Sequence, residues 1–157
     1  MPQLAPFYTP LEKRIRRHVI GPVHTFTIVV SPGLETVCAR ELAKGDMEAQ
    51  EITVFPGQVR FKGRIDALFL TNLHLRTASR ILMHLTEFEA TGFSRLEKKT
   101  AAFPWELFIH RTSPLRIRAS VRQCRLRHTG AVAERVQKAI TGRLSQSGEK
   151  IPREISS

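Results

Sequence analysis

The chain has 157 residues, enough for one ordinary domain or two small ones, and its 41% hydrophobic fraction is that of a globular protein rather than a disordered one. Lys and Arg number 25 against 14 Asp and Glu, and the net charge of +11 favours a polyanionic partner. No apolar run approaches the roughly eighteen residues of a membrane span. Two distant cysteines, Cys38 and Cys124, argue against a disulfide framework or a zinc site and predict a cytoplasmic protein.

The positive charge is unevenly distributed along the chain. Residues 1–23 carry four basic and one acidic side chain, a net +3. Residues 24–92 carry seven basic and eight acidic side chains, a net −1, and residues 93–157 carry fourteen and five, a net +9. We therefore predict a basic N-terminal tail with at most one short helical turn, a nearly neutral first domain and a second domain that meets a polyanion.

Periodicity and turn residues predict six elements in the first domain, in the order strand, helix, strand, strand, helix, strand. In chain order these are a strand over residues 24–30, a helix that begins at Ser31-Pro32-Gly33 and ends at Gly45, a hairpin that turns at Pro56-Gly57, a helix from Ile65 to Ser79 and a strand from Ile81 to Glu89. The order βαββαβ predicts an α+β, ferredoxin-like arrangement of two helices over one face of an antiparallel sheet.

The second domain is predicted to contain two helices and a strand. The expected elements are a helix over residues 94–109 interrupted at Pro104 and anchored by Phe103, Trp105 and Phe108, a strand from Leu115 to Arg122 with one apolar and one arginine face, and a helix beginning at His128-Thr129-Gly130 with Val132, Val136, Ala139 and Ile140 as its buried stripe.

Catalytic and metal-binding patterns are not found in the sequence. The predicted elements do not place either of the two Asp residues beside another carboxylate for acid–base chemistry. The spacing of the six His residues matches no metal-binding motif. Pro32-Gly33 is too short a turn for a nucleotide cofactor. We interpret Cys38 as a small core residue and His84 as a surface or hydrogen-bonded residue. The chain is predicted to hold no catalytic residue, metal or cofactor of its own.

Arginine is concentrated where the predicted strand, loop and helix of the second domain meet. Strand alternation places three arginines on one face, the loop adds two more, and the helix N-terminus offers unpaired N–H groups, with Thr129 as its cap and Gly130 allowing a phosphate to approach. The guanidinium group donates two parallel hydrogen bonds to phosphate. The candidate RNA-binding residues are Arg116, Arg118, Arg122, Arg125, Arg127, His128, Thr129, Gly130, Arg135 and Lys138. The stretch lacks interleaved aromatic residues, so we expect phosphate and shape recognition rather than base stacking.

Two blocks of sequence are specific enough to resemble a known family. Leu75 to Leu82 (LRTASRIL) and Cys124 to Val136 (CRLRHTGAVAERV) resemble the N-terminal region of bacterial THUMP-domain RNA methyltransferases. These enzymes modify guanine in large-subunit ribosomal RNA, and relatives act on tRNA. Weaker similarity is found at residues 26–35, 59–63 and 103–105.

The resemblance implies a ferredoxin-like domain, then a THUMP α/β domain that binds structured RNA, then a methyltransferase domain that uses S-adenosylmethionine. Neither the cofactor loop nor the Asn/Asp-Pro-Pro-aromatic motif of that last domain occurs in this sequence. We therefore expect residues 93–157 to form a C-terminally incomplete THUMP domain. The chain alone is then not an enzyme, S-adenosylmethionine belongs to the missing domain, and the partner is structured ribosomal RNA, with tRNA as the alternative.

Two other functions stay open. One is a stand-alone RNA- or ribosome-binding protein without a methyltransferase domain, which would differ in whether the reading frame continues. The other is a membrane-surface module based on the basic stretch Lys13–His18. The apolar residues Ile15, Val19 and Ile20 offer little surface for such an anchor, which disfavours that function and leaves no membrane partner expected.

Overall fold

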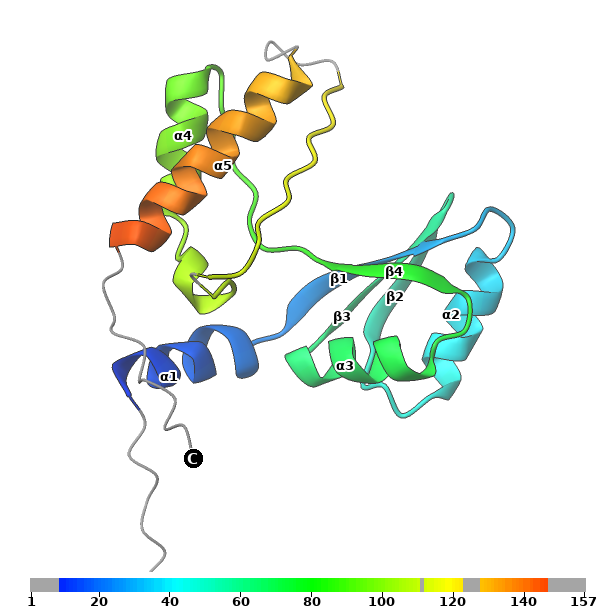
Figure 1. The fold of residues 1–157 in the computed structure, drawn as a ribbon. Helices are drawn as coiled ribbons and strands as arrows, with labels where there is room; N and C mark the ends of the chain where they lie inside the picture. Colours follow the sequence, from blue (N-terminus) through cyan, green and yellow to red (C-terminus); the bar gives the residue numbers. More distant parts are fainter. Residues whose placement is uncertain (1–8, 111, 123–127, 147–157) are drawn as a thin grey trace, which may run out of the picture. The chain divides into compact units, whose positions relative to one another are not determined.

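A computed structural model describes residues 9–110, 112–122 and 128–146 of the chain (Figure 1). The chain divides between Leu85 and Thr86 into two compact units. This division precedes the boundary expected after residue 92. Residues 9–23 belong to the first unit rather than to a separate tail.

The N-terminal stretch is helical for longer than the sequence suggested. Helix α1 (Pro10–Ile15) continues into the π-helix η1 (Arg16–Ile20). Thr9 and Glu12 form a capping box, in which the Thr9 hydroxyl accepts the Glu12 N–H at 3.2 Å and the Glu12 carboxylate accepts the Thr9 N–H at 2.7 Å. Val19 is buried, and its carbonyl lies 2.7 Å from Nε2 of His24. The expectation of a single helical turn is wrong because this cap and this buried side chain stabilise a longer helix.

The first unit has the predicted βαββαβ order. Its elements are β1 (His24–Val30), α2 (Glu35–Lys44), β2 (Gln50–Phe55), β3 (Gln58–Gly63), α3 (Ile65–His74) and β4 (Ala78–Met83). The strands form one antiparallel sheet in the order β2-β3-β1-β4, so β1 lies between β3 and β4, neither of which follows it directly in the chain (Figure 1). The ferredoxin-like prediction is confirmed.

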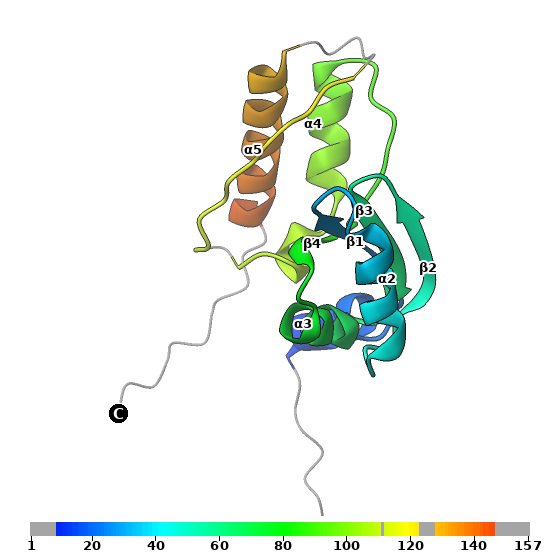
Figure 2. The same ribbon diagram turned by 90° about the vertical axis from the view of Figure 1, so that its right-hand side faces the viewer.

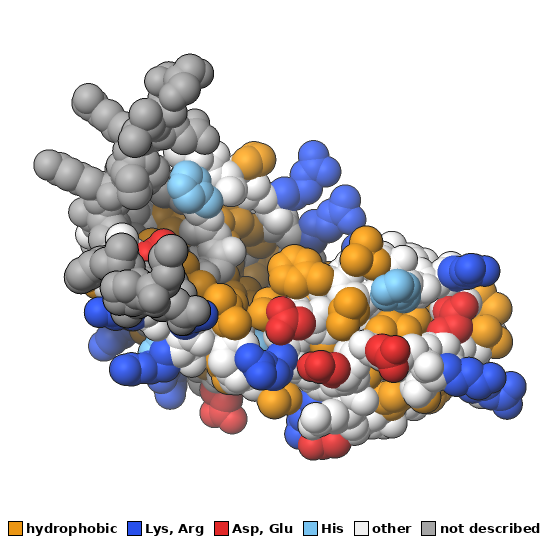
Figure 3. Space-filling view, turned by 90° about the horizontal axis from the view of Figure 1, so that it is seen from below, with side chains coloured by type: hydrophobic (Ala, Val, Ile, Leu, Met, Phe, Trp, Pro, Cys, Tyr) orange, Lys and Arg blue, Asp and Glu red, His pale blue; other side chains and the backbone are white. Residues whose placement is uncertain are grey.

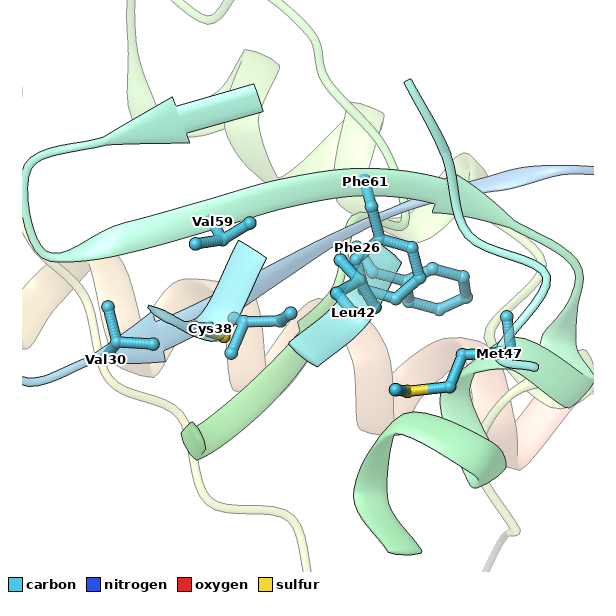
Figure 4. Packing of buried hydrophobic residues seen from close by; sticks show 9 residues of the cluster. Phe26, Val30, Cys38, Leu42, Met47, Val59 and Phe61 are labelled. Atoms are coloured by element: carbon cyan, nitrogen blue, oxygen red, sulfur yellow. The ribbon is translucent and has the colours of Figure 1, made fainter. Parts of the chain in front are cut away.

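The core of this unit lies between the sheet and its two helices. Phe26 of β1 stacks on Phe61 of β3 with ring centroids 5.1 Å apart, and both side chains are fully buried (Figure 4). Cys38 of α2 is also fully buried, and burial raises the pKa of its thiol, which fits the predicted core role. A Cβ at Gly63 would lie 2.7 Å from the Cβ of Ala67, so α3 packs on β3 at a distance only glycine permits.

Three elements in this unit, α2, α3 and β4, have boundaries that differ from the predicted ones. Strand β4 was expected over residues 81–89 and spans residues 78–83. Helix α2 begins at Glu35 rather than at Ser31, because Ser31 and Leu34 close a turn through a 3.1 Å hydrogen bond and Gly33 has a φ of 92°. Helix α3 ends at His74, and Ala78 already belongs to β4. Pairing with β1 draws residues 78–83 into the sheet, so tertiary contacts override the helical spacing.

The second unit consists of two packed helices and their connections. Helix α4 (Phe93–Ala102) is followed by the 3-10 turn η2 (Trp105–Leu107), and α5 runs from Thr129 to Gln146. The interruption at Pro104 and the start of α5 are confirmed. The buried residues are Leu96, Thr100, Leu107, Ile140 and Leu144. Only Ile140 of the predicted four-residue stripe is fully buried, and Leu144, one turn further on, is the second anchor of α5.

The predicted strand from Leu115 to Arg122 does not form. This segment is extended but belongs to no strand ladder in the described part of the chain. Alternation of side chains satisfies one requirement of a strand, and a hydrogen-bonded neighbour is the other.

None of the helices in the described ranges is long and apolar enough to cross a bilayer.

The Glu35 carboxylate connects two turns of the first unit and gives the first prediction. It accepts the N–H of Gly57 at 2.8 Å and the N–H of Gly33 at 2.8 Å, and these bonds, that of Gly57 foremost, lower the Glu35 pKa below its ordinary 4.5. Because the folded-state pKa is the lower one, the stabilisation is complete above pH 4.5 and is lost as pH falls through the lowered pKa.

We expect Glu35→Gln to lower the thermal midpoint at neutral pH, since the amide offers one acceptor oxygen and no charge. The difference from the parent chain should shrink in acid, measured by circular dichroism at a series of pH values. Equal midpoints at neutral pH would contradict this role for Glu35.

Candidate nucleic-acid interface

An arginine row lies along residues 112–122 of the second unit. Arg116, Arg118 and Arg122 are exposed, and the alternate residues Leu115, Ile117, Ala119 and Val121 are half-buried. Although no ladder forms, the extended backbone keeps the predicted two-faced character. At about 3.3 Å per residue, the row from Arg116 to Arg122 is about 20 Å long.

The first turn of α5 lies near the end of this row. Figures 1 and 2 both show residues 112–122 running towards the end of the second unit at which α5 begins. Thr129 is the first helical residue, so His128 rather than Thr129 occupies the cap position, and the His128 carbonyl accepts the Val132 N–H at 3.0 Å. His128, Thr129 and Gly130 are all exposed, and a Cβ at Gly130 would meet nothing within 4 Å. The helix N-terminus is therefore accessible.

Two predicted site residues, Arg125 and Arg127, lie outside the described residues.

Arg135 is engaged within the protein. Its Nη1 lies 2.6 Å from Oε1 of Glu97 on α4, and its guanidinium carbon lies 5.5 Å from the Phe93 ring centroid. The hydrogen bond to Glu97 raises the pKa of the Arg135 guanidinium. Arg135 therefore connects α5 to α4, and Glu97 offsets its charge. Sequence reasoning did not anticipate this pair because its partners are far apart in the chain.

Lys138 lies apart from the arginine row. Nine positions beyond Thr129, it is about 13.5 Å further along the helix axis. It lines a shallow groove of about 370 Å³ between α4 and α5, together with Lys98 of α4. The groove lining is Glu97, Lys98, Ala101, Lys138, Ala139, Gly142, Arg143 and Gln146. Lys98 was not predicted, although its exposed place on an amphipathic helix was the available signal.

Acidic residues of the second unit are partly neutralised by ion pairs. Glu106 of η2 accepts two hydrogen bonds from Arg143 of α5, at 3.3 Å from Nε and 3.1 Å from Nη2. The Glu106 side chain is only 10% exposed. Glu97 and Glu106 thus offset Arg135 and Arg143, not the arginine row. Within the described ranges no group of three His, Cys, Asp or Glu side chains could hold a metal ion.

The Glu106–Arg143 pair gives the second prediction. Arg143→Ala removes both hydrogen bonds from a mostly buried carboxylate and should lower the free energy of unfolding of the second unit by about 1–3 kcal/mol. Chemical denaturation followed by fluorescence of Trp105, the single tryptophan, reports this unit directly. The control Lys138→Ala removes an exposed cation and should leave the midpoint nearly unchanged. Equal midpoints for the two variants would show that the pair does not stabilise the unit.

The first unit matches a known domain family. Residues 25–82 match the model of the RlmL ferredoxin-like domain. Over 128 residues the chain is 29% identical to "Ribosomal RNA large subunit methyltransferase K/L" of Syntrophotalea carbinolica, covering 81% of this chain and 18% of that protein. Over 86 residues it is 36% identical to "Putative RNA methyltransferase YpsC" of Bacillus subtilis, covering 55% of this chain and 22% of that protein. The chain thus spans about a fifth of the length of these two relatives.

Solved structures extend the likeness over both units. A predicted N6-adenine-specific DNA methylase from Listeria monocytogenes has a TM-score of 0.69 at 28% identity, over 79% of this chain and 32% of that one. SMU.472, a putative methyltransferase complexed with SAH, has a TM-score of 0.65 at 27% identity, over 78% of this chain and 32% of that one.

Proposed function

We propose that the chain is the RNA-targeting module of an S-adenosylmethionine-dependent RNA methyltransferase. The proposal is supported by the match of residues 25–82 to the RlmL ferredoxin-like domain model and by the similarity of the chain to two RNA methyltransferases. The observation that carries this proposal is the exposed arginine row of residues 112–122, next to the accessible start of α5. We assign the second unit to the THUMP class of RNA-binding domains.

The chemistry of the row suits phosphate recognition. Arg116 and Arg118 point to one side of an extended backbone, about 6.6 Å apart along it. Each guanidinium presents a planar fork of donors that matches a phosphate group. The first-turn N–H groups of α5 and its positive dipole end add donors that are already in place. Such a surface binds a folded RNA backbone strongly and carries little information about base sequence.

The proposed partner is structured ribosomal RNA, since one match, over 128 residues, is to a methyltransferase named for the large ribosomal subunit. Transfer RNA is the alternative. We place the protein in the cytoplasm, as its two distant cysteines predict. A stand-alone RNA-binding protein remains the rival function, and it differs in having no methyltransferase domain on the same polypeptide.

Reversing the arginine row tests the site. Arg116→Glu, Arg118→Glu and Arg122→Glu together should weaken binding to a hairpin RNA by on the order of a hundredfold or more, and should lower the salt slope of log affinity by about one per lost contact. Fluorescence anisotropy over a series of salt concentrations measures both. Circular dichroism should show an intact fold, because all three side chains are exposed.

The basic helix α1–η1 is the rival anchor. Deleting it would also remove the buried Val19, so charge reversal is the cleaner control. Lys13→Glu with Arg17→Glu should reduce affinity far less than the triple variant. If this pair abolishes binding while the triple variant binds normally, the site is wrong.

The cofactor gives a separate prediction. S-adenosylmethionine titrated into the purified chain should produce no binding heat, since we assign the cofactor to a domain outside this sequence. Stoichiometric binding in the calorimeter would contradict that assignment, whatever the RNA affinity.

A further inference from the structure

The sheet of the first unit has a second face that α2 and α3 do not cover. The core residues Phe26 and Ile28 of β1 face the helices, so their neighbours along the strand face the other way. Strand register then identifies the side chains on this open face. They are Thr25, Thr27 and Val29 of β1, the partners Lys62, Arg60 and Gln58 on β3, Thr53 and Phe55 on β2, and Leu82 and Arg80 on β4.

Positive charge is concentrated on this open face. Arg60 and Arg80 are exposed, and among the described residues neither has a carboxylate within ion-pairing distance. Lys62 pairs with Glu51 of β2 at 2.6 Å, so one of the three cations is offset. Two arginines therefore remain uncompensated, one on either side of the central strand.

The helical face of the same unit has a different character. On α2, Glu35 and Glu41 balance Arg40 and Lys44, and α3 adds Asp66. Leu73 of α3, one of the exposed apolar residues of this face, is 78% accessible to solvent. Figure 3 shows acidic and apolar side chains beside Lys and Arg on the face seen from below. The charge of residues 24–92 sums to −1, and that sum conceals a separation of charge between the two faces.

The open face presents guanidinium groups that suit the phosphates of an RNA backbone. The Arg60 guanidinium carbon lies 4.8 Å from the ring centroid of Phe55, an arrangement that holds the planar fork in place. Thr27 lies between the two arginine-bearing strands and offers a hydroxyl that donates or accepts. Arg60 and Arg80 are two strands apart and two positions out of register, which separates their Cα atoms by about 12 Å.

We propose that this open face, centred on Arg60, Thr27 and Arg80, is a second contact for the RNA backbone. This second contact rests on the proposed function, which identifies RNA as the ligand. The near-zero net charge of the first domain gave no indication of such a site. The two guanidinium groups bind separate phosphates of the same RNA that the arginine row binds, and the Thr27 hydroxyl lies between them. Both units then contribute to affinity through counterion release.

The test uses the full chain, a fluorescent hairpin RNA and a salt series. Arg60→Glu with Arg80→Glu should lower affinity on the order of tenfold or more and reduce the salt slope by about two. The matched control is Arg40→Glu with Lys44→Glu, which makes the same change in net charge on exposed residues of the helical face. The control should change the affinity only slightly and leave the salt slope intact.

Each outcome bears on one claim. If Arg60→Glu with Arg80→Glu binds like the parent chain, the open face is overturned as a contact, while RNA binding by the second unit stands. If both pairs weaken binding equally, only the general charge matters and the site is overturned. If the parent chain binds no RNA, this inference and the proposed function both fail.

Discussion

Alternation of side chains along extended backbone is the constraint on which both units of this protein depend. In β1 it directs Phe26 and Ile28 into the core and Thr25 and Thr27 to the opposite face. In residues 112–122 it half-buries every second residue and leaves Arg116, Arg118 and Arg122 in solvent. A buried Phe or Ile contributes about 1.5–3 kcal/mol, whereas an exposed ion pair contributes about 0–1 kcal/mol. The apolar face therefore determines stability, and the opposite face can carry cations for binding.

Ion pairs within the fold offset the charge of some cations, so that other cations are available to bind a ligand. Three acidic side chains, Glu51, Glu97 and Glu106, offset Lys62, Arg135 and Arg143 respectively. The pairs of the second unit connect α4 and η2 to α5, so they fasten its helices together. The arginine row and the Arg60 and Arg80 side chains of the open face are outside these pairs. Because these three acids are paired with other cations, they do not offset the charge of the arginine row.

Features that depend on neighbouring residues in the sequence were predicted well. Features that depend on contacts between distant segments were not predicted. The hairpin at Pro56-Gly57 and the start of α5 are encoded in a few neighbouring residues, and both are confirmed. The end of α3 depends on pairing of residues 78–83 with β1, which helical spacing does not reveal. The strand over 115–122 failed for the same reason, because a strand needs a neighbour. The Arg135–Glu97 pair and the charge of the open face both depend on contacts between distant segments, so composition alone did not show them.

Amide hydrogen exchange of the full chain, with and without hairpin RNA, shows whether a two-faced extended backbone presents the RNA-binding cations. We expect slower exchange on RNA binding over residues 112–122, over the first turn of α5 and along β1, β3 and β4, with α2 unchanged. Residues 112–122 belong to no strand of the described sheet, so their backbone amides should exchange quickly without a ligand. The change on RNA binding should therefore be largest in this segment. Protection confined to the α1–η1 helix, or absent from residues 112–122, would contradict RNA binding by the arginine row.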